Sequence, residues 1–90
     1  MAVDPNVPWD LIVQVKRSER KTEIVKSLGK EPACASELGD EMDIQTDSAS
    51  NYLRDLKQME PPVVRCITPN QPHHRLYALT SDGRTIIEHL

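Results

Sequence analysis

The hydrophobic period of this chain changes at Pro61 and Pro62, and this change limits the fold more than any other feature. Before the two prolines, apolar residues recur at spacings of three and four, which is the period of an α-helix. After them, "VVRCIT" and "RLYALT" alternate and are rich in β-branched residues, which is typical of strands. A chain of 90 residues has material for one small core. We therefore expect a single, mainly α domain over 1–90 that carries a small β-hairpin.

Two helices are expected before residue 30. Proline suits the first turn of a helix, so Pro8 can begin a short helix through "PWDLIVQV". Ser18 is a typical N-cap, and "ERKTEIVKSL" after it places three aliphatic residues on one face. Gly29 follows directly, and a glycine after a helix is commonly left-handed. We therefore predict an amphipathic helix that Ser18 begins and Gly29 ends.

Two further helices are expected between residue 30 and the paired prolines. The segment from Ala35 to Met42 has inward apolar residues at spacings of three and four, and its opposite face is acidic. Thr46 or Asp47 is expected to cap the next helix by accepting a hydrogen bond from a free backbone N–H. That helix has an apolar stripe with a helical period, and the prolines end it.

The remainder of the chain is expected to form a hairpin and a closing helix. The alternating segments 63–68 and 75–80 are separated by "PNQPHH", which predicts an antiparallel pair with a six-residue tip. Thr80 or Ser81 can cap the last helix. Three core helices, a two-stranded wing and a C-terminal helix together make the layout of a winged helix-turn-helix. This is the predicted fold class.

The helix that follows residue 45 keeps small hydrogen-bonding side chains on its outer face. A helix that enters the major groove of DNA needs groups there that read base edges, and Asn suits adenine whereas Arg suits guanine. A solvated face without a partner would account for the same pattern. The candidate DNA-binding residues of this helix are Thr46, Asp47, Ser48, Ser50, Asn51, Arg54, Asp55 and Lys57.

Four segments also resemble the archaeal winged helix-turn-helix transcriptional regulators. They are "WDLIVQVKRSERKTEIVKSL", "ACASELGDEM", "ASNYLRDLKQM" and "RLYALTSDGRTIIEHL", and together they cover nearly the whole chain. The positions that carry the resemblance are Ser36, Glu37, Leu38, Ser50, Leu53, Leu56, Arg75, Tyr77, Leu79, Thr80 and Gly83. The chain departs from the family at "PPVV", where relatives commonly have a Gly-Leu-Val stretch. The resemblance implies a winged-helix fold and binding to double-stranded DNA.

The charge of the chain is unevenly distributed. The net charge of −3 by itself argues against a nucleic-acid partner, but residues 1–30 carry six bases and four acids, whereas 31–60 carry two and eight. The candidate contacts to the DNA backbone are Arg17, Arg20 and Lys21, and those of the wing are His73, His74 and Arg75. Together with the basic residues of the helix before the wing, these side chains offer about 4 to 6 phosphate contacts per subunit. Because this is few for one subunit, we expect a homodimer.

The terminal segments are the candidate dimer surfaces. They are "PWDLIVQV", which contains Trp9, and "IIEHL" at the other end of the chain. In so small a domain the same segments could simply complete the core.

A different class of function is compatible with the same fold. The acidic helix before residue 43 could face a basic protein, which would make the chain a protein–protein interaction module without DNA binding. Retention on a heparin or DNA column at low salt discriminates between the two.

Other classes have little support. Cys34 and Cys66 stand alone rather than in close ligand pairs, so we predict no metal site, with Cys34 at a helix start and Cys66 in a strand facing the core. No phosphate loop, nucleophile elbow or carboxylate pair is present, so we expect no enzyme, no cofactor and no small-molecule substrate. The chain has no long apolar run and no secretory leader, so a cytoplasmic location is expected.

Overall fold

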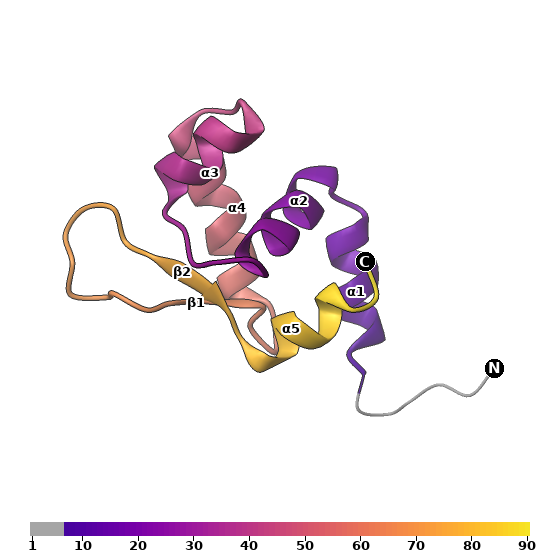
Figure 1. Cartoon of the computed structure of the whole chain (residues 1–90). Coiled ribbons are helices and arrows are strands. Elements are labelled where there is room, and N and C mark those ends of the chain that lie inside the picture. The colour runs from indigo at the N-terminus through magenta and orange to yellow at the C-terminus, as the bar shows by residue number, and fades with distance from the viewer. Residues whose placement is uncertain (1–6) are drawn as a thin grey trace.

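The computed structural model describes residues 7–90, which form five helices and a two-stranded hairpin (Figure 1). The elements are α1 (Trp9–Lys16), α2 (Glu19–Leu28), α3 (Ala35–Met42), α4 (Thr46–Gln58), β1 (Val64–Cys66), β2 (Tyr77–Leu79) and α5 (Ser81–Ile87). In Figure 1 the loop between β1 and β2 extends from the side of the molecule that carries α3, whereas α1 and the C-terminus lie on the opposite side. The predicted fold class, a mainly α winged helix-turn-helix, is confirmed.

Two of the predicted caps are present and a third is not. The Ser18 hydroxyl accepts a hydrogen bond from the backbone N–H of Lys21 at 3.2 Å, and the Thr80 hydroxyl accepts one from that of Gly83 at 3.1 Å. The prediction that Thr46 or Asp47 caps α4 is wrong, because Thr46 is already helical and the extended residue before it is Gln45. Asp47 instead lies in the first turn, where a carboxylate complements the positive end of the helix.

Gly29 ends α2, but for a different reason from the predicted one. Its φ of −66° and ψ of −22° are right-handed, so the left-handed conformation predicted for it is wrong. A Cβ at this position would collide with Cδ1 of Ile87. The C-terminal segment therefore approaches Gly29 closely, and the sequence around residue 29 carries no sign of that contact.

The turn between α3 and α4 is tight because two residues allow it. Asp43 takes the left-handed conformation at the end of α3, with φ of 56° and ψ of 46°. The backbone N–H of Ile44 donates to the carbonyl of Gly39 at 2.9 Å. A Cβ on Gly39 would lie 2.9 Å from the carbonyl oxygen of Ile44, so this approach of the two backbones favours glycine. The sharp turn brings the start of α4 next to α3.

One core joins all the helices to the base of the hairpin. Most side chains that the helical periods predict to face inward are buried, and Val63 and Leu79 join them from the hairpin. Ala35, Ile87 and Leu90 are only half-buried. The largest fully buried side chains are Val15, Ile24, Val25, Leu38, Leu53, Leu56, Val63, Val64 and Ile86. Among residues 7–90 no helix is long and apolar enough to cross a membrane.

The strands pair as predicted but are shorter than the alternating segments. β1 and β2 are antiparallel, with Val64 opposite Leu79 and Cys66 opposite Tyr77. Cys66 therefore lies in a strand, and its side chain is partly buried. Beyond the strands the backbone N–H of Ile67 still bonds to the carbonyl of Leu76 at 2.9 Å, but pairing then stops at a segment containing two prolines, which lack the N–H that a ladder needs.

A contact that the sequence did not reveal ties the wing to the helices. Ala33, between α2 and α3, exchanges two backbone hydrogen bonds with Tyr77 of β2, at 3.1 and 2.9 Å. A single paired residue has no hydrophobic period, so pattern reasoning could not identify it. The bridge fixes the root of the wing beside the first residues of α3.

Candidate nucleic-acid interface

The outer flank of α4 is polar and accessible. The helix buries Ala49, Leu53 and Leu56, and this places Asn51 and Arg54 on the exposed side. Neither side chain makes a hydrogen bond or ion pair with any residue between 7 and 90. Of the other candidates on this helix, Thr46, Asp47, Asp55 and Lys57 are exposed, and Ser48 and Ser50 are half-buried. The predicted readers therefore stand on the outside of the helix.

The start of α4 and the wing lie around one hollow, which we call the wing hollow. Its volume is about 460 Å³. From α4 it is lined by Thr46 and Ser50, and from the wing by His73, His74 and Arg75. Residues predicted from two distant parts of the chain are thus brought together on one face.

The wing tip, residues 67–76, is held by hydrogen bonds within itself. The side-chain amide of Gln71 donates to the carbonyls of His73 and His74, at 2.7 and 3.1 Å. The carbonyl of Gln71 accepts from Nε of Arg75 at 2.8 Å. His74 has a φ of 53°, a conformation that non-glycine residues rarely adopt. Gln71 therefore shapes the backbone of the tip and holds the Arg75 side chain, a role that sequence reasoning missed.

The hollow contains other residues that were not predicted as site residues. Ser36 and Cys34 line it from the start of α3, and Pro72 and Tyr77 line it from the wing. Ser36 and Tyr77 belong to the motifs that resemble the archaeal regulators, and this was the only signal that could have found them. Cys34 is buried, and its thiol lies 3.1 Å from the Ser36 hydroxyl and 3.2 Å from Oε1 of Glu37.

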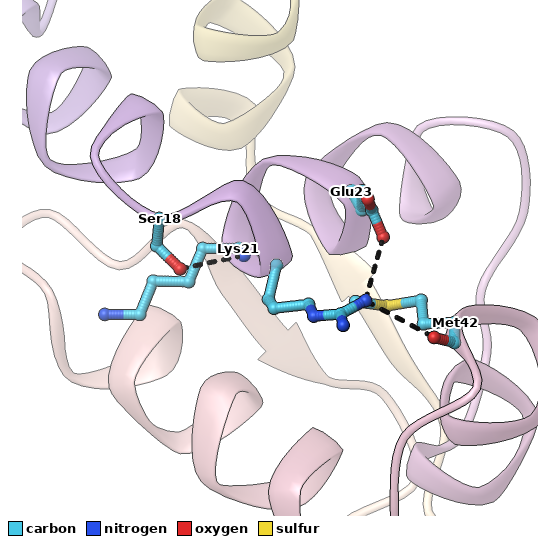
Figure 2. Close-up of polar contacts among 5 residues, drawn as sticks. Ser18, Lys21, Glu23 and Met42 are labelled. Carbon is cyan, nitrogen blue, oxygen red and sulfur yellow. Dashed lines mark hydrogen bonds and ion pairs between the residues drawn. The ribbon is translucent and has the colours of Figure 1, made fainter.

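The basic residues near the start of α2 differ in their contacts. Figure 2 shows those that involve Ser18, Glu23 and Met42. Arg20 donates from Nη1 to the carbonyl of Met42 at 3.3 Å and lies 3.8 Å from Oε2 of Glu23. Lys21 places Nζ 3.5 Å from Oδ2 of Asp55 on α4. Arg17 is exposed and has no such contact within residues 7–90. Two of the three cations predicted to meet the DNA backbone therefore also hold helices together in the free protein.

The terminal segments contribute to the core, and part of their apolar surface stays exposed. From α1, Leu11, Ile12 and Val15 complete the core, whereas Trp9 and Val13 remain 37% and 49% exposed. The Trp9 ring lies 4.9 Å from that of His89, centroid to centroid. An apolar strip one helical turn long is thus left on the outside of α1.

The cysteines do not assemble a metal site in the part of the chain that the structure describes. Cys34 and Cys66 are both free thiols. Across residues 7–90 no group of three or more His, Cys, Asp or Glu side chains is placed to hold an ion.

Comparison with known proteins identifies the fold. No protein-family model and no curated protein matches the sequence. Two solved structures of Lactococcus lactis ZitR are similar, one of a double mutant and one of a cysteine-to-serine mutant. The double mutant has a TM-score of 0.68 at 14% identity over 80% of this chain, and the cysteine-to-serine mutant has 0.68 at 12% identity over 99% of it. This chain spans about half of their length, 49% and 53% respectively. At this identity the likeness shows a shared winged-helix fold.

Proposed function

We propose that this protein binds double-stranded DNA and acts as a transcriptional regulator. The observation that carries the proposal is the wing hollow, around which the first turns of α4 and the basic wing tip meet. A winged helix-turn-helix binds DNA with its third core helix in the major groove and its wing on the neighbouring groove or backbone. The structure offers both elements on one face, and this supports such an arrangement.

In the proposed complex the polar flank of α4 enters the major groove. Asn51 and Arg54 are exposed and not engaged elsewhere in residues 7–90, so both can turn to base edges, where they suit adenine and guanine. Thr46, Ser48 and Ser50 are short enough to let the helix backbone approach. Arg75 and the two histidines of the tip then face phosphates beside the groove, and Arg17 adds a contact from the start of α2.

The proposal is tested by two substitutions with different expected outcomes. Asn51→Ala should relax sequence preference in selection from a pool of random duplexes, because a base contact is lost. Arg75→Ala should weaken binding to every duplex and lower the magnitude of the salt slope by about 0.9, because a phosphate contact is lost. Fluorescence anisotropy across a salt series measures the second effect.

Arg84→Ala is the matched control for these experiments. Arg84 is an exposed arginine on α5, a helix that lines no part of the wing hollow. Its removal changes the net charge as Arg75→Ala does, and it should leave affinity nearly unchanged. Equal effects of the two substitutions, together with unchanged selection by Asn51→Ala, would show that this face does not bind DNA.

We further propose a homodimer, joined through α1. One subunit offers few phosphate contacts, and a second copy on a two-fold site would double them. Trp9 and Val13 are large apolar side chains, exposed one helical turn apart, on a helix that lines no part of the wing hollow. Sedimentation equilibrium of the wild type and of Val13→Glu tests this, because a charge at the centre of the strip should shift a dimer to monomer.

The acidic side of α3 favours a second candidate function. Glu37, Asp40, Glu41 and Asp43 are all exposed, and they present negative charge to a partner. A basic protein would suit that surface, and the chain would then be an interaction module of the same fold. Wild-type protein that passes through a DNA column at low salt would favour this function.

Some finer expectations rest on sequence alone. The resemblance to archaeal regulators depends on the motifs around Ser36, Ser50 and Arg75. A single domain over 1–90 and a cytoplasmic location are consistent with the proposed role, and residues 1–6 lie outside the described part of the chain.

A further inference from the structure

The strongest unexplained feature of the proposed DNA surface is a negative charge on it. Asp55 follows Asn51 by one helical turn, so it stands on the outer side of α4, and its side chain is 56% exposed. DNA presents a dense row of phosphates to any protein that binds it. A carboxylate in this position repels the phosphates and therefore opposes binding, so its presence needs an explanation.

Asp55 has a partner on another helix. Its Oδ2 lies 3.5 Å from Nζ of Lys21, whose side chain is only 19% exposed. Within residues 7–90 this is the one ion pair that joins two helices. Lys21 is itself a predicted contact to the DNA backbone, so the pair occupies a cation that DNA would use.

Each of the two charges interacts unfavourably with the dipole of its own helix. Lys21 lies in the first turn of α2, where the helix dipole disfavours a positive charge, and Asp55 lies in the last turn of α4, where it disfavours a negative one. Each residue therefore relieves an unfavourable position of the other. This accounts for the pairing in the free protein but not for the presence of the two charges at this surface.

We propose that Asp55 is a counter-charge that lowers the affinity of this surface for DNA, by neutralising Lys21 and by facing the phosphates. The inference rests on the proposed function. The Lys21 side chain is only 19% exposed, so Asp55 keeps its ammonium group occupied. The carboxylate itself lies on the outer side of α4, where it would repel nearby phosphates. Because phosphate contacts supply essentially all non-specific affinity, Asp55 reduces binding to all sequences and leaves discrimination to the base contacts.

The opposite role is also chemically defined, which makes the inference testable. An aspartate in the major groove can accept a hydrogen bond from the N4 amino group of cytosine. If Asp55 reads a base, its removal lowers affinity for the preferred sequence. If Asp55 is a counter-charge, its removal raises affinity for any sequence.

The experiment compares Asp55→Asn, Lys21→Ala and the double variant with wild type, on a duplex of mixed sequence, by anisotropy across a salt series. Asp55→Asn should bind more tightly and steepen the salt slope by about 0.9 per subunit, because Lys21 becomes free to neutralise a phosphate. The ratio of its affinity to that of wild type should fall about three- to four-fold between about 50 and about 200 mM salt. Lys21→Ala should barely change the slope, and the double variant should lose the steepening.

Asp40→Asn is the matched control. Asp40 is an exposed aspartate on α3 that makes no ion pair within residues 7–90, so its substitution makes the same change in net charge without releasing a lysine. Its salt slope should equal that of wild type. Thermal unfolding should show that all four variants are folded at the assay temperature.

Three results would overturn the inference. They are an unchanged or weaker affinity of Asp55→Asn, an equal steepening in Asp40→Asn, and a steepening that persists in the double variant. If the protein does not bind DNA at all, the result is different: wild type and Arg75→Ala would then bind duplex equally poorly even at the lowest salt.

Discussion

The two ends of the proposed DNA surface are built in different ways. At the α2 end, Arg20 and Lys21 are attached to other elements, the first to the carbonyl of Met42 and the second to Asp55. At the wing end, Arg75 bonds to Gln71, four residues before it in the same loop, and to no other residue between 7 and 90. Both sets of cations were predicted for the same task, yet one set is part of the helical framework and the other is not.

Because of this difference, substitutions at the two ends should affect the stability of the fold and the binding of DNA differently. Removal of a cation at the α2 end should disturb the packing of the helices as well as any contact with DNA. Removal of one at the wing tip should affect DNA alone, because the tip contributes no side chain to the core. The wing nevertheless depends on its base, where Thr80 and Gly83 pack against the backbone of Val63.

The largest effect is expected at the base of the wing. A Cβ on Gly83 would collide with the backbone oxygen of Val63 and would lie 3.2 Å from Cβ of Leu79. Backbone and a buried side chain cannot move aside easily, so Gly83→Ala should lower the free energy of unfolding by about 1–3 kcal/mol. Denaturant titration measures the loss.

Gly29→Ala is the control for this prediction. The atom that a Cβ at Gly29 meets is Cδ1 of Ile87, the far end of a flexible side chain, and the backbone there suits alanine. Its cost should be clearly smaller than that of Gly83→Ala. The reverse order would mean that α5 does not press on the wing base as the structure has it.

These two glycines also show how far the sequence could lead. Gly83 was marked by a motif, and Gly29 by its place after an amphipathic helix, so both were recognised as important positions. The reason for each lies in a residue distant along the chain, Val63 for one and Ile87 for the other. Local patterns predict where helices begin and end, whereas close approaches depend on how the finished helices pack.

In the candidate site, too, local pattern predicted some features, whereas others depend on how the helices pack. The exposure of Asn51 and Arg54 was predictable, because helical period alone decides which side of α4 is buried. The pairing of Lys21 with Asp55 was not, since it depends on the angle at which α2 crosses α4. Gln71 was missed for a related reason, because its hydrogen bonds arise from the folded shape of a loop that has no period.

A second, smaller effect on stability should distinguish the two ends directly. Arg20→Ala removes a hydrogen bond from a charged group to a carbonyl at the end of α3, and should cost about 1 kcal/mol. Arg75→Ala removes the same side chain at the wing tip, and should change stability by less than about 0.5 kcal/mol. Equal losses in thermal or denaturant unfolding would remove the distinction between framework and tip.

A substitution that loosens the wing tip should lower the affinity for DNA and leave the stability of the fold unchanged. Gln71→Ala removes the amide that holds two backbone carbonyls of the tip, so the loop must be ordered when DNA binds. We expect an affinity loss of about 1 kcal/mol, or about five-fold, with stability unchanged. Asn70→Ala, at the exposed neighbouring residue, should change neither quantity. A loss of stability in Gln71→Ala would show that the tip belongs to the framework after all.

The smallest effect is expected for Arg17, which combines features of the two ends. It lies beside α2, but its side chain has no polar partner within residues 7–90, so it resembles the cations of the wing in being free. Arg17→Ala should lower the magnitude of the salt slope by about 0.9 per subunit and leave unfolding unchanged. Lys30→Ala, at an exposed cation just beyond the far end of α2, should leave the slope as it is.

Because Lys21 is already neutralised by Asp55, its removal should lower the slope less than removal of Arg17, although both lie near the start of the same helix. If Lys21→Ala lowers the slope as much as Arg17→Ala, the ion pair does not restrain Lys21, and the two ends of the surface differ only in stability.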